Sequence, residues 1–156
     1  MSQTLDQIFI ANPASSLQST DLIYLSRSPY TAGNDFGITA ANFIASTSAI
    51  QWHGIAGTTQ AAAVNSGYVV QNAGQTTVTL PATAPLGSVV SLRGLGAAGW
   101  IMAANAGQTI KVDGQTTSSG GSLTSNGQYD SIDVTCVVAN LTWIASSMVS
   151  TGLTFA

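Results

Sequence analysis

Charge is what this chain has least of. Its 156 residues include three basic residues, six Asp and no Glu, so 6% of the chain is formally charged. A soluble monomeric domain normally carries about 25% charged residues, and catalytic sites need titratable side chains gathered in space. The composition therefore favours a component of an assembly over an enzyme, and we expect no catalytic residues.

The shortage of Lys and Arg also excludes two classes of partner. A nucleic-acid footprint needs clustered basic side chains, and so does a polybasic membrane patch. No apolar run approaches the roughly 18 residues of a membrane span, and the N-terminal residues lack the pattern of a secretory signal. We expect synthesis in a cytoplasm, no nucleic-acid partner and no membrane insertion.

Cysteine and histidine occur once each. Cys136 cannot form a disulfide within the chain, and its place in the apolar run 134–138 predicts a small buried side chain. His53 alone makes neither a catalytic triad nor a zinc site, unless a threefold axis gathers three copies. A packed or interface histidine is the favoured interpretation, and we expect no metal and no cofactor.

Gly, Ser, Thr and Asn are abundant, with many β-branched residues, so helix propensity is poor and an all-β body is favoured. Residues 1–50 predict a small docking module, with strands over 21–27 and 36–38 and a short helix over 40–45 that Thr39 caps. Residues 51–67 carry small side chains without a clear period. They are either a flexible linker or a segment pressed against neighbouring chains.

Residues 68–156 contain about eight strand patterns at intervals of roughly 8–12 residues, which predict an antiparallel β-sandwich of jelly-roll-like form. The longest strand is expected over 131–139, followed by a turn at Asn140. Asp113-Gly114 and Asn126-Gly127 are hairpin signals.

Two patterns resemble catalytic motifs without their context. Gly94, Gly96 and Gly99 match the spacing G-x-G-x-x-G, but a dinucleotide site needs a helix after the last glycine, and residues 100–103 have the pattern of a strand. A glycine-rich loop between strands is expected instead. Asp130 and Asp133 are three residues apart, so a strand would point them to opposite faces and they do not predict a carboxylate pair.

Ligand binding, if this chain has it, is expected from aromatic and polar side chains. Trp100 borders the glycine loop and is the best candidate for stacking on a sugar ring, whereas Trp143 is expected in the core. Asn126, Gln128 and Tyr129 lie at a predicted hairpin tip, where polar recognition is often found.

Two parts of the chain resemble virion proteins of tailed bacteriophages. Segments 13–17 (PASSL), 19–23 (STDLI) and 37–43 (GITAANF) are similar to modules at the start of tail-fibre and baseplate-attached proteins. Segments 68–70, 77–81, 86–90 and 106–110, with Trp143, resemble β-rich domains of such fibres.

The resemblance implies a non-enzymatic homotrimer of the virion. Residues 1–50 would dock on other virion proteins and residues 68–156 would project as a short fibre, a collar or adaptor, or a capsid-decorating head fibre. An adhesin tip that binds host surface glycans is the main alternative. A hydrolase or lyase with carboxylates from neighbouring chains is a third.

Overall fold

The computed structural model describes residues 22–26, 35–39 and 50–156, and the chain divides into two compact units, Met1–Ala49 and Ile50–Ala156. In the first unit β1 (Leu22–Ser26) pairs antiparallel with β2 (Asp35–Thr39). These two strands confirm the predictions over 21–27 and 36–38. The helix predicted over 40–45 lies outside the described residues.

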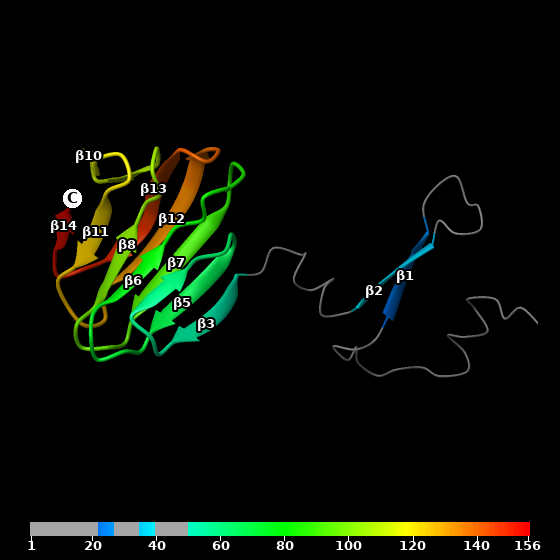
Figure 1. The fold of residues 1–156 in the computed structure, drawn as a ribbon, viewed down its shortest axis with the longest axis horizontal. Coiled ribbons are helices and arrows are strands. Elements are labelled where there is room, and N and C mark those ends of the chain that lie inside the picture. The colour runs from blue at the N-terminus through cyan, green and yellow to red at the C-terminus, as the bar shows by residue number, and fades with distance from the viewer. Residues whose placement is uncertain (1–21, 27–34, 40–49) are drawn as a thin grey trace, which may run out of the picture. The chain divides into compact units, whose positions relative to one another are not determined.

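The second unit is built from two facing sheets, and its described residues contain no helix (Figure 1). A seven-strand sheet has the order β10-β9-β13-β12-β7-β5-β3, and a five-strand sheet has the order β14-β11-β8-β6-β4. Their bounds are β3 Gln51–Ile55, β4 Thr59–Ala61, β5 Ser66–Val70, β6 Thr76–Thr79, β7 Val89–Gly94, β8 Trp100–Ala103, β9 Thr109–Val112, β10 Gln115–Thr116, β11 Ser122–Ser125, β12 Ser131–Val138, β13 Thr142–Val149 and β14 Leu153–Phe155.

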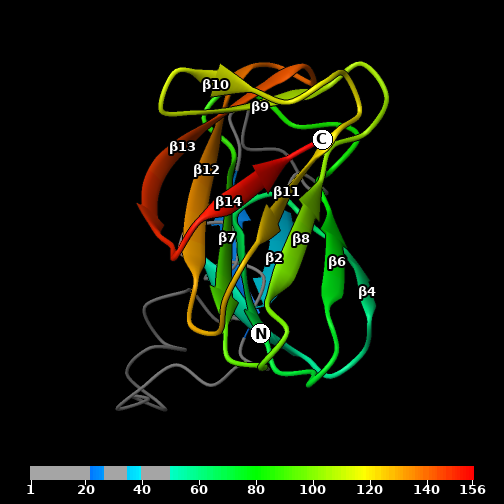
Figure 2. The ribbon, with the colours of Figure 1, turned by 90° about the vertical axis from the view of Figure 1, so that its left-hand side faces the viewer.

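The chain alternates between the two sheets from β3 to β8. Odd-numbered strands β3, β5 and β7 pair in parallel in the seven-strand sheet, and β4, β6 and β8 pair in parallel in the five-strand sheet. Figure 2 shows β4, β6, β8, β11 and β14 following one another across one sheet. The successive strands β3–β4, β5–β6 and β7–β8 therefore each form one coil of a short stack. After each coil the chain returns to the same sheet and runs in the same direction.

The remaining strands close this stack with mostly antiparallel pairs. β11 pairs antiparallel with β8, and β12 pairs antiparallel with β7, so the chain runs back along the last coil. β12 and β13 form a hairpin, while β13 pairs in parallel with β9. The prediction of an all-β body is confirmed. The prediction that its sheets are antiparallel is wrong, because both sheets are mixed.

Residues 51–67, expected to be either a flexible linker or a segment pressed against neighbouring chains, are part of the sandwich, and it is the linker interpretation that the structure contradicts. They contain β3, β4 and the first two residues of β5. Ile55 is buried in the core and Ala62 packs against it. The prediction is wrong because a three- to five-residue strand with small side chains leaves little periodicity, and because main-chain pairing with β5 and β6 supplies the order that the side chains do not show.

The turn predictions have mixed outcomes. Asp113 and Gly114 both have positive φ and join β9 to β10, as the hairpin signal predicts. Asn140 has a φ of 63° and turns β12 into β13, also as predicted. Asn126-Gly127 does not form a hairpin, because β11 belongs to the five-strand sheet and β12 to the seven-strand sheet.

The core fills the space between the sheets with side chains from alternate strand positions. Trp143 and Cys136 are fully buried there, as predicted, and the Cys136 thiol donates to the carbonyl of Ala84 at 3.4 Å. On β12 the inward face comprises Ile132, Val134 and Cys136, but Val138 is exposed because a bulge interrupts the pairing after Cys136.

Candidate functional site

Asp130 organises the end of the sandwich where the sequence placed its candidate site. This carboxylate is 2% exposed and accepts hydrogen bonds from the amides of Asn126, Gly127 and Thr151, at 3.2, 3.1 and 2.9 Å. The hydroxyl of Ser150 adds a fourth at 3.2 Å. Asp130 therefore fixes the β11–β12 loop to the β13–β14 turn, which is a structural role for a buried charge.

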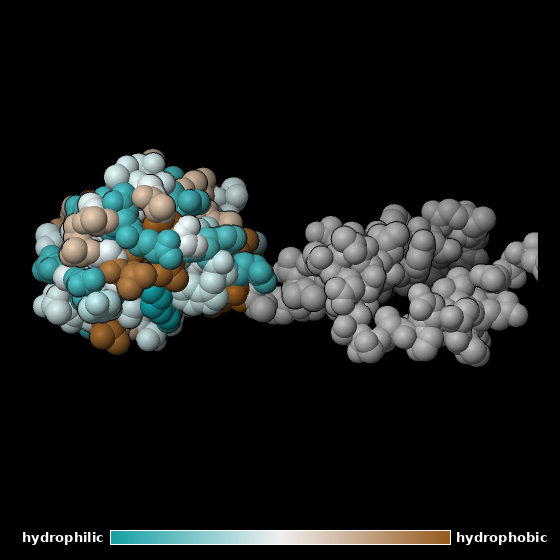
Figure 3. Space-filling view, turned by 90° about the horizontal axis from the view of Figure 1, so that it is seen from below, coloured by the Kyte–Doolittle hydropathy of each residue, from teal (hydrophilic) through white to brown (hydrophobic). Residues whose placement is uncertain are grey.

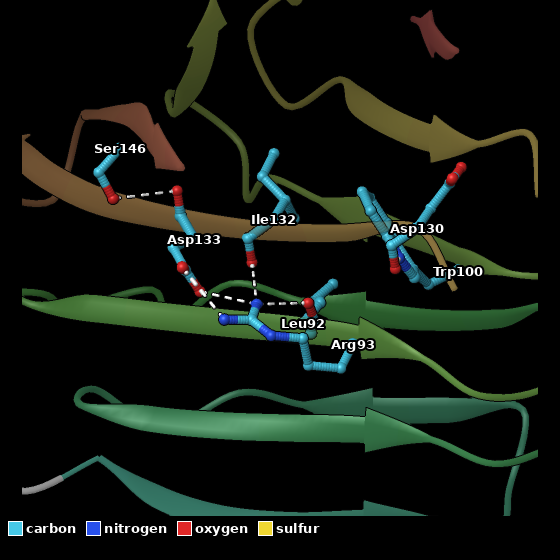
Figure 4. Close-up of polar contacts among 7 residues, drawn as sticks. All are labelled: Leu92, Arg93, Trp100, Asp130, Ile132, Asp133 and Ser146. Carbon is cyan, nitrogen blue, oxygen red and sulfur yellow. Dashed lines mark hydrogen bonds and ion pairs between the residues drawn. The ribbon is translucent and has the colours of Figure 1, made fainter. Parts of the chain in front are cut away.

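Trp100 lies beneath this loop and is fully buried. Its indole Nε1 donates to the carbonyl of Asp130 at 2.9 Å, and the amide of Gly94 donates to the same oxygen at 2.9 Å. Figure 4 shows the Trp100 ring beside Asp130. The prediction of an exposed sugar platform at Trp100 is wrong, because Trp100 occupies an inward position of β8, as Met102 does, and a buried indole N–H needs an acceptor.

The three polar candidates do lie at the surface of this end. The Gln128 side chain donates to the main-chain carbonyl of Leu95 at 2.9 Å. The side-chain amide oxygen of Asn126, Oδ1, accepts from the Thr154 hydroxyl at 3.3 Å. Tyr129 is 68% exposed with a φ of 68°, and its amide donates to the carbonyl of Gly94 at 2.8 Å. The structure thus places Asn126, Gln128 and Tyr129 on the surface of one loop, but the side chains of Asn126 and Gln128 bond to different neighbouring segments and Tyr129 is exposed.

The glycine-rich segment is the β7–β8 loop, as expected, and its glycines serve close packing. The amides of Leu95 and Gly96 both donate to the carbonyl of Val70 at 2.8 Å. A Cβ atom at Gly96 would stand 1.7 Å from the carbonyl oxygen of Asn72. The loop lies directly on the β5–β6 loop, and a strand follows it where a dinucleotide site would need a helix.

A second cluster lies on the outward face of the seven-strand sheet, and sequence analysis did not assemble it. Trp52 on β3 is 49% exposed and lies flat across Gly67, where a Cβ atom would stand 2.6 Å from the ring. The Arg93 guanidinium is 5.3 Å from the Trp52 ring centroid, within range of a cation–π contact. Arg93 also forms a two-point ion pair with Asp133, at 2.8 and 3.2 Å (Figure 4).

The Asp133 carboxyl is tuned by this pairing. Partial burial acts to raise its pKa, but the hydrogen bonds from Arg93 and the positive charge of Arg93 outweigh burial, so the pKa of Asp133 is lowered. Asp130 and Asp133 point apart, as predicted, because one enters the loops and the other faces outward on β12. Residues 52, 93 and 133 come together because β12, β7, β5 and β3 are neighbours in that order, and this order could not be predicted from the sequence.

Open surface hollows lie around the β9–β10 hairpin. One, of about 350 Å³, lies against residues 111–116 and Ile144, and another of about 190 Å³ lies between Val112, Met148 and Phe155. Asp113 and Lys111 are the ionisable side chains at these hollows.

His53 is exposed, although its ring stacks on Tyr68 with ring centroids 5.5 Å apart, so it is not a buried core histidine. Among the described residues, no group of three or more His, Cys or Asp side chains could hold a metal ion. The same part of the chain has no helix long and apolar enough to cross a membrane.

Figure 3 shows hydrophobic side chains interrupting a largely pale and teal surface on the face seen from below. No family model matches the chain, and a search of curated proteins found no match.

Proposed function

We propose that this chain is a non-enzymatic structural protein of a bacteriophage virion, a short trimeric fibre or fibre-like component. Residues 1–50 dock it on other virion proteins, and the jelly-roll-like sandwich projects and contributes to host attachment. In the alternative form of this proposal, the chain is a capsid-decorating head fibre, with the same structural role at another position on the particle. Synthesis takes place in the host cytoplasm.

The placement of charge is the observation that carries this proposal. The second unit has five charged residues, and one of them, Asp130, is buried as a structural anchor. Arg93 and Asp133 neutralise each other on the seven-strand sheet. Much of the remaining surface is uncharged, so copies of the chain can pack together without mutual repulsion or costly desolvation of ions.

The oligomeric state tests the proposal. Sedimentation equilibrium of the full chain at micromolar concentration is expected to give three times the mass of 15.8 kDa. A monomer under these conditions contradicts the proposal. Labelling of intact particles with an antibody against residues 50–156 then distinguishes a tail from a head position.

Exposure of Tyr129 favours a second function, attachment to host surface glycans. A bulky side chain with positive φ is uncommon and marks sites where the surrounding structure holds it in place. Tyr129 stands beside half-exposed Leu95, and the Gln128 bond fixes the loop between them. A glycan array probed with the wild type and with Tyr129→Ala tests this function, since a binding signal that survives the substitution excludes Tyr129 as the platform.

A further inference from the structure

We propose that the open end of the coil stack is the surface on which a second copy of this chain docks. We call it the coil-end surface and define it as the outer edges of β3 and β4 with the side chains of Trp52, Thr59, Ala61 and Val64. The inference rests on the assembly proposed above and names the surface that makes it.

Both sheets end at the same side of the stack. β3 is the terminal strand of the seven-strand sheet and β4 is the terminal strand of the five-strand sheet. They belong to one coil, and the next coils, β5–β6 and β7–β8, follow in the same order in both sheets. Figure 1 shows β3 at the margin of its sheet, and Figure 2 shows β4 at the margin of the other. Two strand edges, one sandwich thickness apart, therefore face outward together.

The hydrogen bonds identify which main-chain groups face that way. The amide of Gln51 donates to Asn65 and the carbonyl of Ile55 accepts from Gln71, so these odd positions of β3 face β5. In a parallel ladder the intervening residues face the opposite side. The amides and carbonyls of Trp52 and Gly54 are therefore directed to the outer edge.

The same alternation holds on β4. The carbonyl of Thr58 accepts from Thr77 and the amide of Ala62 donates to Thr79, which places Thr59 and Ala61 on the outer edge. The coil-end surface thus offers four residues whose main-chain donors and acceptors are arranged to pair with another strand edge.

Protein edges normally carry features that prevent such pairing, and the described residues of this one lack most of them. Short strands, lysine, inward charges, proline and bulges are the common protections of an edge strand, and of these the coil end has the three-residue length of β4. Residues 36–92 contain no Asp, Glu, Lys or Arg, β3 and β4 contain no Pro, and their pairings show no bulge. The opposite margin of the seven-strand sheet differs, because β10 has two residues and follows Lys111 and Asp113.

Side chains at the coil end also suit a protein contact. Trp52 is half-exposed and Val64 is 37% exposed. The Trp52 ring lies on the outward face over Gly67 and towards Arg93, so it is already immobilised where it borders the β3 edge, and covering its exposed side costs little side-chain entropy. Buried tryptophan and arginine are the residues that most often dominate the energy of protein interfaces.

Copies of this chain are the occupants that satisfy both edges. In the trimer proposed above, the β3 edge of each copy would meet one neighbour and its β4 edge the other, and each neighbour presents an uncharged strand edge in return.

The test compares matched edge variants of the full chain by sedimentation equilibrium. Ala61→Lys places a charge on β4, and Thr154→Lys places the same charge at an exposed position of β14, the opposite edge of the same sheet. We expect Ala61→Lys to weaken self-association by roughly tenfold or more and Thr154→Lys to leave it unchanged.

Hydrogen exchange of the wild type provides a readout that does not depend on a variant folding. The amides of Trp52, Gly54, Thr59 and Ala61 are expected to be protected in the oligomer and to exchange rapidly after dilution. Emission of Trp52 should shift to the red on the same dilution, because Trp100 and Trp143 are fully buried and change little.

The outcomes separate the two proposals. A wild-type oligomer that Ala61→Lys leaves intact, or whose four edge amides exchange without protection, overturns the coil-end assignment and leaves the assembly in place. Loss of association in both variants also overturns it, since the contact would then cover the five-strand sheet. A monomeric wild type overturns both proposals.

Discussion

The outward faces of the two sheets differ in charge although their inward faces are alike. On the five-strand sheet one row of outward residues runs in register across all five strands and holds four threonines and one isoleucine: Thr59, Thr77, Ile101, Thr124 and Thr154. On the seven-strand sheet the outward positions include Arg93, Lys111 and Asp133, with Trp52 and Ile144 among them.

This difference shows that the pattern of buried residues, which the fold requires, is independent of the charge on the outward faces. Alternation of inward and outward residues is satisfied equally by both sheets, and the core does not distinguish them. Charge is confined to one outward face, so its absence from the other face is not a requirement of strand pairing. Four substitutions, in order of decreasing effect, test this interpretation.

Breaking the link between the two sheets should have the largest effect. Asp130→Ala leaves the amides of Asn126, Gly127 and Thr151 without their acceptor at the crossing from β11 to β12. Stranding buried donors costs about 1–3 kcal/mol per group, and we expect a loss of about 4 kcal/mol in the free energy of unfolding after local relaxation. Urea denaturation measures it.

Asp130→Asn is the control for that substitution, because it keeps one acceptor oxygen and the side-chain shape. It should cost less than Asp130→Ala. Equal stability of the two variants would show that hydrogen bonds to the carboxylate do not hold the sheets together at this end.

Close contact between neighbouring coils should rank second. Gly96→Ala places a Cβ atom 1.7 Å from the Asn72 carbonyl oxygen, so the backbone of one loop must move. Overpacking of this kind costs about 1–3 kcal/mol, measurable as a lower urea midpoint. Gly74→Ala is the matched control in the neighbouring loop, since its Cβ would meet its nearest neighbour at 3.7 Å. A Gly96→Ala variant as stable as Gly74→Ala contradicts the stacked-loop arrangement.

The charged face gives a smaller and pH-dependent effect. Because the pKa of Asp133 is lowered in the folded state, the stability that it contributes is present above its unfolded pKa of about 3.9 and is lost as pH falls through the folded pKa. Asp133→Asn should remove this part of the acid sensitivity and cost about 1 kcal/mol or less at neutral pH, as half-exposed ion pairs do. Thermal melts from pH 7 down to pH 2 measure both effects, and an unchanged acid profile would contradict the assignment.

Sequence alone predicted the β class, the β9–β10 and β12–β13 turns, and the burial of Cys136 and Trp143. These follow from local signals, such as Asp-Gly and Asn turns and the alternation of apolar residues on β12. The parallel coils could not be predicted in this way. They depend on which sheet each strand joins, and residues 51–67 carry almost no periodic signal of their own.

The candidate site divides along the same line. The prediction that residues 126, 128 and 129 lie at the surface is confirmed, because a polar segment with glycine between two strands forms a loop whichever sheet the next strand joins. Trp100 was misplaced because proximity to a glycine loop does not fix the side to which a strand residue points. Trp52, Arg93 and Asp133 are brought together by strand order, which pairs positions 41 and 40 residues apart in sequence.

A charge on the uncharged face should have the smallest effect on folding. Thr124 is half-exposed on the outward row of the five-strand sheet, so a lysine there can extend into water along its aliphatic stem. We expect Thr124→Lys to change the free energy of unfolding by about 0.5 kcal/mol or less. Ser147→Lys, at an exposed outward position of β13, is the matched variant on the charged face. If both urea midpoints stay near that of the wild type, the sandwich tolerates charge on either sheet, and the lack of charge on the five-strand sheet is not a requirement of folding. A loss above about 1 kcal/mol for Thr124→Lys alone would instead make the uncharged row a requirement of the fold.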